Sequence, residues 1–153
     1  MSEVSWVPEG YEGVTPYLIC RNCESAIEFY KKAFGAEELF RIGEPGMVGH
    51  AEMKIGKAIF MLADEHPEMG AISPETVGGS PVSLMVYVPD VDGFVEKAAA
   101  EGAEIVRPVA DQFYGDRSGM IKDPYGHTWN FATHKEDIDP EELNRRAAEL
   151  HGS

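Results

Sequence analysis

The sequence is poor in cysteine and contains no long apolar run. Its 153 residues include two cysteines, too few for a disulfide framework. No stretch approaches the roughly 18 to 20 apolar residues that a membrane helix needs. The first ten residues have neither a basic start nor an apolar run, so we expect no secretory signal and a cytoplasmic location. We also expect no membrane partner.

Positive charge is scarce as well. The sequence contains 13 basic and 27 acidic side chains, which gives a formal net charge of −14. Such a surface repels nucleic acid and anionic lipid, so a nucleic-acid partner is excluded and a partner selected by charge is cationic or neutral. The alternative is that the acidic excess only keeps the protein in solution.

The two cysteines, Cys20 and Cys23, form a Cys-Arg-Asn-Cys sequence before an expected helix. This spacing occurs in thiol redox pairs and in halves of zinc sites. A zinc site needs two more ligands, and the histidines are scattered along the chain. Cys20 also continues the apolar run that begins at Tyr17, which favours a role as a small packed side chain.

The most informative segment is residues 111–134, because it predicts two strands joined by a tight Asp-Pro-Tyr-Gly turn. Pro124 presets φ for the turn, and Gly126 can take a conformation that side chains resist. After the turn, Trp129 and Phe131 alternate with polar residues, which is the period of a strand with one wet face. The segment is therefore a β-hairpin.

A β-α-β-β-β order occurs twice along the chain, which predicts an α+β fold of two βαβββ modules within a single domain. Gly35-Ala36-Glu37 recurs as Gly102-Ala103-Glu104, each time where a helix gives way to a strand, as expected for a duplicated module. Asn22 and Asp90 are expected to cap the two helices, and Asp139 a third. Module one covers about 14–66 and module two about 82–134, with a linker at about 67–81 that is rich in proline and glycine and a C-terminal helix at about 140–150. The expected strands are residues 14–20, 37–42, 48–55, 58–63, 82–88, 104–110, 116–122 and 127–133.

Several segments resemble the vicinal oxygen chelate superfamily, which contains the glyoxalase, bleomycin-resistance and extradiol dioxygenase proteins. They are the Asp-Pro-Tyr-Gly turn, Ala26-Ile27-Glu28-Phe29-Tyr30 and Phe34-Gly35-Ala36, and the hairpin sequence GDRSG…DPYGHTW is similar to the PhnB-like branch. The resemblance implies curved mixed sheets around a shared cleft, formed within one chain or across a swapped homodimer. In metal-using members the first and last strands of each module supply the ligands of a divalent ion.

The family's four ligand positions fall on Thr15, Met61, Ser83 and Asn130. None is a histidine or a carboxylate, and a tight divalent site needs such groups to offset dehydration of the ion. We therefore predict no metal and no other cofactor. A different metal site using His50, Glu52 or His127 stays open as an alternative.

Strand alternation then indicates which side chains line the cleft. With Thr15 and the other ligand positions as reference, the predicted ligand-binding residues form an aromatic and thioether pocket with a few neutral polar groups. Filling the space between the modules is the alternative role for these residues. The set is Tyr17, Ile19, Met61, Ser83, Met85, Tyr87 and Asn130, together with Arg117.

Two further features carry chemistry. His50 and Glu52 share a strand face, and a carboxylate beside a histidine suits a general base, although polar residues at this spacing often only meet water. Arg117 lies between two glycines and can hold a carboxylate or aromatic ligand through its planar fork, or brace Asp116 or Asp111.

Three function classes follow. The first is a metal-free protein that binds a cationic or aromatic small molecule in the manner of the bleomycin-resistance members. The second is a metal-dependent lyase, isomerase or dioxygenase, and the third is a thiol redox protein built on Cys20 and Cys23. The open-sided modules and the apolar stripe of the last helix predict a homodimer.

Overall fold

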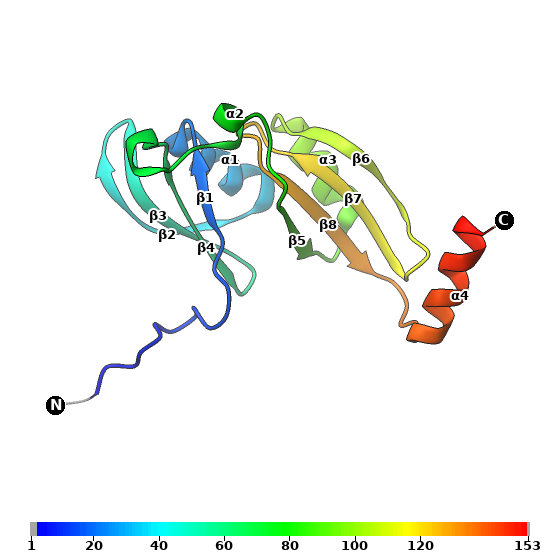
Figure 1. Ribbon diagram of the computed structural model, residues 1–153. Helices are drawn as coiled ribbons and strands as arrows, with labels where there is room; N and C mark the ends of the chain where they lie inside the picture. Colours follow the sequence, from blue (N-terminus) through cyan, green and yellow to red (C-terminus); the bar gives the residue numbers. More distant parts are fainter. Residues whose placement is uncertain (1–2, 153) are drawn as a thin grey trace. The chain divides into compact units, whose positions relative to one another are not determined.

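The computed structural model describes residues 3–152, which divide into two compact units. The first unit ends at Ser80 and the second begins at Pro81. Each unit contains a four-stranded mixed sheet with a helix packed on one face (Figure 1). The α+β class with two βαβββ modules and a C-terminal helix is therefore confirmed.

In the first unit the strand order is β1-β4-β3-β2, with β1 parallel to β4 and the other pairs antiparallel. The elements are β1 (Tyr17–Cys20), α1 (Cys23–Phe34), β2 (Glu37–Glu44), β3 (Met47–Ile55), β4 (Ala58–Asp64), the short 3₁₀ helix η1 (Pro67–Met69) and α2 (Pro74–Val77).

Helix α1 begins and ends where the sequence predicts. The Asn22 side chain accepts the Ser25 N–H, and Gly35 ends the helix with φ of 67°. Ile27 and Tyr30 of the helix are fully buried, as is Leu62 of the sheet. Burial of side chains of this size stabilises a fold by roughly 1.5 to 3 kcal/mol each, so the face of the sheet that carries α1 holds the core of this unit.

The second unit repeats this arrangement with the strand order β5-β8-β7-β6. Its elements are β5 (Ser83–Tyr87), α3 (Val91–Ala100), β6 (Glu104–Asp111), β7 (Asp116–Lys122), β8 (Thr128–His134) and α4 (Pro140–His151). Asp90 caps α3 by accepting the Gly93 N–H. Phe94 of this helix packs against Phe131, with ring centroids 4.6 Å apart, so the core again lies on the helix-covered face.

The Asp-Pro-Tyr-Gly turn between β7 and β8 is organised by the buried carboxylate of Asp123. One oxygen accepts the backbone N–H groups of Tyr125 and His127 at 2.9 and 3.0 Å, and the other accepts the Trp129 indole N–H at 2.9 Å. The turn is thereby tied to the core of its unit, which explains why aspartate precedes the proline.

Most predicted strand ends lie within two residues of those in the structure, and two larger differences remain. The first strand begins at Tyr17 rather than at residue 14, although the backbone pairing extends to Pro16, whose carbonyl accepts the Met61 N–H. Residues 67–81, predicted as the linker between the modules, contain the short helices η1 and α2, which the sequence did not predict. Ser73 caps α2 by accepting the Thr76 N–H, and Pro74 occupies its first turn.

Helix α4 extends from Pro140 to His151 with Asp139 as its N-cap, as predicted. None of its residues is buried, and Leu150 of its apolar stripe is 61% exposed. Arg146 joins the helix to the rest of the unit through the Phe113 carbonyl and the Glu136 carboxylate. Among residues 3–152, no helix is long and apolar enough to cross a membrane.

Candidate functional site

Each sheet has one face covered by a helix and one face without a helix, which we call the open face. On β1, Leu18 and Cys20 are buried on the helix side, whereas Tyr17 is 48% exposed and Ile19 is partly exposed on the open face. The sheet register places Tyr17, Met61 and Glu52 side by side across β1, β4 and β3. The open face of the first unit therefore brings together predicted ligand-binding residues and one predicted catalytic residue.

A hydrogen-bonded chain of four side chains crosses this open face. Tyr17 Oη lies 2.7 Å from His50 Nδ1, and His50 Nε2 lies 2.7 Å from Glu52 Oε2. The Tyr11 hydroxyl donates to the other oxygen of Glu52. We call these residues, Tyr11, Glu52, His50 and Tyr17, the relay.

The geometry of the relay assigns its donors and acceptors. A carboxylate accepts hydrogen bonds, so the His50 tautomer with its proton on Nε2 suits both neighbours: Nε2 donates to Glu52, and Nδ1 accepts a hydrogen bond from the Tyr17 hydroxyl. Burial, together with the nearby Cys23, raises the pKa of Tyr17, which keeps its hydroxyl protonated. Tyr17 is the most exposed end of the relay toward a ligand.

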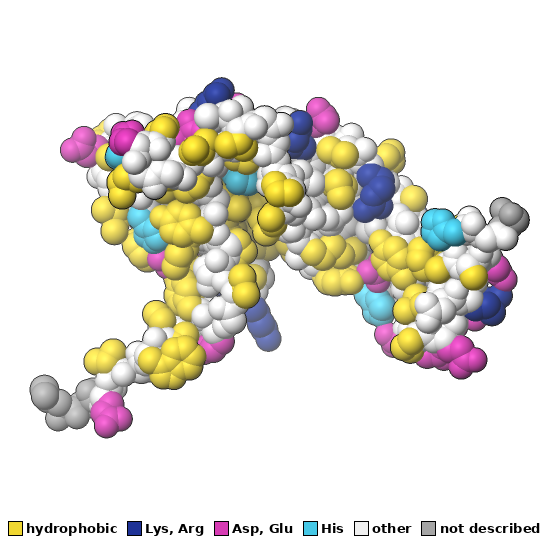
Figure 2. Space-filling view, in the orientation of Figure 1, with side chains coloured by type: hydrophobic (Ala, Val, Ile, Leu, Met, Phe, Trp, Pro, Cys, Tyr) yellow, Lys and Arg dark blue, Asp and Glu magenta, His cyan; other side chains and the backbone are white. Residues whose placement is uncertain are grey.

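Apolar side chains surround the relay. Phe40 and Tyr17 each contact the His50 ring, with centroid distances of 5.9 and 5.5 Å. Figure 2 shows hydrophobic side chains gathered over β1 and β4, with histidine side chains among them. An adjoining pocket of about 460 Å³ is lined by Tyr17, Ile19, Met47, Val48, Gly49, Ala63, Asp64, Glu65, His66, Met69 and Ala71.

The open face of the second unit carries a different polar network. Asn130 Nδ2 donates to Ser83 Oγ at 3.1 Å, and Asn130 Oδ1 accepts from Arg107 Nη2 at 3.3 Å. Arg107 Nη1 also donates to Ser118 Oγ at 3.3 Å, and the Tyr114 hydroxyl lies 3.5 Å from the same oxygen. We call this set the Arg107 network.

Predicted residues Met85 and Tyr87 lie on the same open face, 48% and 59% exposed. The Tyr87 hydroxyl donates to buried Asp116 at 2.8 Å, and His134 Nδ1 lies 2.7 Å from the same carboxylate. Asp116, with a further contribution from Asp137, raises the pKa of His134. These contacts order the end of β8.

Arg117 lies elsewhere. Its guanidinium forms two hydrogen bonds with Asp92 of α3, at 2.8 and 2.9 Å, and one with Asp111 at 3.2 Å. The contact with α3 places Arg117 on the helix-covered side of the sheet. The ion pair with Asp111 matches the structural alternative given for Arg117 in the sequence analysis. Ligand binding by Arg117 stays a prediction.

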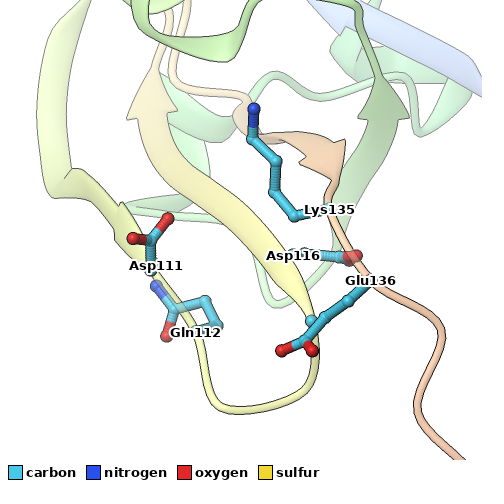
Figure 3. Close-up of a pocket in the computed structure, with 6 residues that line it drawn as sticks. Asp111, Gln112, Asp116, Lys135 and Glu136 are labelled. Atoms are coloured by element: carbon cyan, nitrogen blue, oxygen red, sulfur yellow. The ribbon is translucent and has the colours of Figure 1, made fainter.

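Another hollow, of about 480 Å³, lies at the turn between β6 and β7 (Figure 3). In the figure, Lys135 extends away from the carboxylates of Asp111 and Glu136. These carboxylates are already bonded, Asp111 to Arg117 and Glu136 to Arg146. The hollow is therefore lined by groups that hold the turn and α4 in place.

Cys20 and Cys23 are fully buried, and neither forms a disulfide within residues 3–152. Burial, with a smaller contribution from Asp64, raises the pKa of Cys23 to about 12. Because the thiolate is the reactive form, this thiol is a poor nucleophile near neutral pH.

The side chains at the family's metal positions do not fit a divalent ion. They supply two hydroxyls, one thioether and one amide, without the imidazole or carboxylate that such an ion requires. The Arg107 guanidinium also bonds Asn130 directly and would repel a cation there. Within residues 3–152, no three histidine, cysteine, aspartate or glutamate side chains form a group that could hold a metal.

Two βαβββ units, each a four-stranded mixed sheet with a helix on one face, define the architecture of this protein. Residues 14–131 match the model of the Glyoxalase/Bleomycin resistance protein/Dioxygenase superfamily. The chain belongs to this superfamily, which confirms the resemblance found in the sequence.

Relatives at the sequence level include an uncharacterized protein of Mycobacterium tuberculosis, 37% identical over 134 residues that cover 85% of this chain and 79% of that protein. Among solved structures, a gene product of Arabidopsis thaliana is 28% identical with a TM-score of 0.66, covering 80% of this chain and 98% of that one. TioX from Micromonospora sp. ML1 is 25% identical with a TM-score of 0.64, covering 84% of this chain and all of that one.

Proposed function

We propose that the protein binds a small aromatic molecule, neutral or cationic, on the open face of its first unit, and does so without a metal. The observation that carries the proposal is the exposed end of the relay, Tyr17, which borders a pocket lined by Met47 and Met69. Aromatic rings and thioethers offer broad, adaptable contact area, and the Tyr17 oxygen offers a hydrogen bond.

The charges around this pocket favour a neutral or cationic guest over an anion. Asp64 and Glu65 line it, and Asp64 accepts the Cys23 and Val48 backbone N–H groups at 2.7 Å each. Glu65 lies 3.9 Å from Arg21, so its charge is partly offset. An anion would meet two carboxylates here, while a cation over Tyr17 would gain from the ring face.

Absence of a metal is part of the proposal. It is supported by the donor chemistry at Thr15, Met61, Ser83 and Asn130, since these groups offer a divalent ion no charge. Protein purified without an affinity tag should carry no stoichiometric zinc, nickel, iron or manganese. One equivalent of bound metal per chain, lost when His50 or Glu52 is replaced, would favour the metalloenzyme alternative.

The binding proposal can be tested with methionine methyl groups as reporters, using phenethylammonium and the neutral 2-phenylethanol as probes. Titration should shift the methyl signals of Met47, Met61 and Met69 in a saturable way. The signal of Met53, which is fully buried in the core, should not move. Shifts confined to the second unit would contradict the proposal.

A matched pair of variants completes the test. Met61→Ala removes a thioether beside Tyr17 and should weaken binding about tenfold, the effect of losing part of one apolar side chain. Met120→Ala makes the same change on the open face of the second unit and should leave binding of these probes unchanged. Equal effects of both substitutions would count against the assignment.

A second candidate function is proton transfer by the relay. It is favoured by the continuous hydrogen bonds from Glu52 through His50 to Tyr17. Tyr17 Oη could pass its proton to His50 Nδ1 as it takes a proton from a ligand carbon, with Glu52 beside the resulting imidazolium, and the reverse steps would return a proton to the ligand. The test is hydrogen–deuterium exchange at carbon atoms of bound ketones, followed by NMR. Exchange that survives Tyr17→Phe would refute this role.

The remaining expectations are proposals of the same kind. We propose that the protein is a cytoplasmic homodimer. We also propose that it belongs to the PhnB-like branch, because its last hairpin has the sequence GDRSG…DPYGHTW. Support for a dimer comes from β2 and β6, which form sheet edges whose backbone groups a partner could cover.

A further inference from the structure

The arginines of this protein differ in their partners. The others, Arg21, Arg41, Arg117, Arg145 and Arg146, each form an ion pair with one or more carboxylates. Arg107 forms none within residues 3–152, although the chain carries 27 acidic side chains. A guanidinium that only filled space in so acidic a protein would be expected to find a carboxylate partner.

Neutral groups hold Arg107 in place instead. Its guanidinium donates to Ser118 and Asn130, both at 3.3 Å, a length at which hydrogen bonds are weak. A guanidinium has five N–H donors, so three remain without an acceptor in the described part of the chain. Asn130 is itself fixed by Ser83, so its oxygen is directed at Arg107 before any ligand arrives.

The surroundings of Arg107 are apolar and accessible. The sheet register aligns Met85, Asn130, Met120 and Arg107 as neighbours across the open face. Met85 is 48% exposed, and Tyr114, which also contacts Ser118, is 38% exposed. The face therefore offers one positive charge beside thioether and aromatic surface.

We propose that Arg107 anchors the carboxylate of a small organic acid whose apolar or aromatic part lies on Met120 and Met85. A carboxylate matches the planar fork of a guanidinium and forms hydrogen bonds that are stronger than those to neutral groups. This inference goes beyond the binding proposed for the first unit and does not depend on it, because it concerns a different face and the opposite charge.

The net charge of −14 does not oppose such a site. At physiological ionic strength charges are screened over about 8 Å, so the nearest groups decide the local field. The nearest carboxylate along β7 is Asp116, which is held by Tyr87 and His134 rather than by Arg107.

The probe is phenylacetate, with phenylacetamide as its neutral counterpart, titrated into the full-length protein and followed by NMR. Phenylacetate should shift the Arg107 Nε–H and the Asn130 side-chain amide signals, and phenylacetamide should bind at least about tenfold more weakly, since a charged hydrogen bond contributes about 1.5 to 3 kcal/mol. Shifts that avoid these signals, or equal binding of the two probes, would overturn the proposal. Shifts near Tyr17 report on the first unit, so the two proposals fail separately.

Three variants sharpen the test. Arg107→Gln should weaken phenylacetate binding about tenfold or more, whereas Lys97→Gln, the same charge change on α3, should leave it unchanged. Asn130→Asp places a carboxylate beside Arg107 at nearly constant shape, so the guanidinium is neutralised and phenylacetate binding should be abolished. This variant keeps the proposal testable if Arg107→Gln fails to fold. Undiminished binding by Asn130→Asp, or an equal loss in Lys97→Gln, would overturn it.

Discussion

Replacement of Asp123 by asparagine is predicted to destabilise the second unit more than any surface change of equal size. Its carboxylate is 3% exposed and serves donors on both oxygens: two backbone N–H groups of the turn and the indole N–H of Trp129. Asparagine keeps one acceptor oxygen and presents an NH₂ group to the donors on the other side. Either the turn or Trp129 must then lose its acceptor.

The magnitude follows from that geometry. A buried donor without an acceptor costs about 1 to 3 kcal/mol, and hydrogen bonds to a neutral amide are weaker than those to a carboxylate. We therefore expect Asp123→Asn to lower the free energy of unfolding by about 2 to 4 kcal/mol. Urea unfolding measures this loss, and the slope should not change because the surface exposed on unfolding is the same.

Asp139→Asn provides a matched control for this substitution. Asp139 caps α4 by accepting the Glu142 N–H at 2.9 Å, and aspartate and asparagine cap helices about equally well. This variant should lose less than about 0.5 kcal/mol. A loss below about 1 kcal/mol for Asp123→Asn would refute the reasoning, since the buried donors would then have found other acceptors.

Three other predictions follow from the structure. Met61→Ala should lower the free energy of unfolding by less than about 1 kcal/mol if the side chain lies on an open face, whereas a buried methionine would cost about 2 to 5 kcal/mol, and denaturant unfolding separates the two. Because Asp116 and Asp137 raise the pKa of His134 in the folded state, its stabilising contribution is complete below the unfolded pKa of about 6.5 and disappears as pH rises through the folded pKa. His134→Gln should therefore remove part of the decline in melting temperature above about pH 6.5, and an unchanged pH profile would contradict it. Sedimentation should show a two-fold dimer, and a monomer at micromolar concentration would rule out that assembly.

Much of the fold could be predicted because local signals agree with the global arrangement. Asn22 and Gly35 mark the ends of α1 as capping chemistry requires, and strand β7 lies at the predicted residues 116–122. Helix α2 within the predicted linker was missed because it is one turn long, too short for a helical period to appear, and only the Ser73-Pro74 pair indicates it.

The sheet face of a side chain was predictable where strands are regular. Alternation from Thr15 placed Tyr17 and Ile19 on one face, and the resemblance placed Met61 there. In the structure Met61 lies between Tyr17 and Glu52 in the sheet register, and His50 joins both through hydrogen bonds. Neither Tyr17 nor Tyr11 could be joined to His50 and Glu52 from the sequence, because contacts across 33 and 41 residues depend on tertiary packing.

The role of Arg107 could not be predicted from the sequence, for a local reason. Register shifts on both sides of Arg107 interrupt the alternation of β6, next to Pro108, so the direction of the side chain could not be counted along the strand. The sequence indicated Arg117 as the ligand-binding arginine instead, because it lies between two glycines. Arg107 differs from the other arginines in having no carboxylate partner in the described part of the chain, and this becomes visible only in three dimensions.

The open face of the first unit is proposed to bind a small aromatic molecule without a metal. The phenethylammonium titration repeated in excess chelator tests this most directly, with the Met47, Met61 and Met69 methyl signals as readout. We expect saturable shifts of the same size and midpoint with and without chelator. Shifts that appear only after a divalent transition metal is added would contradict it.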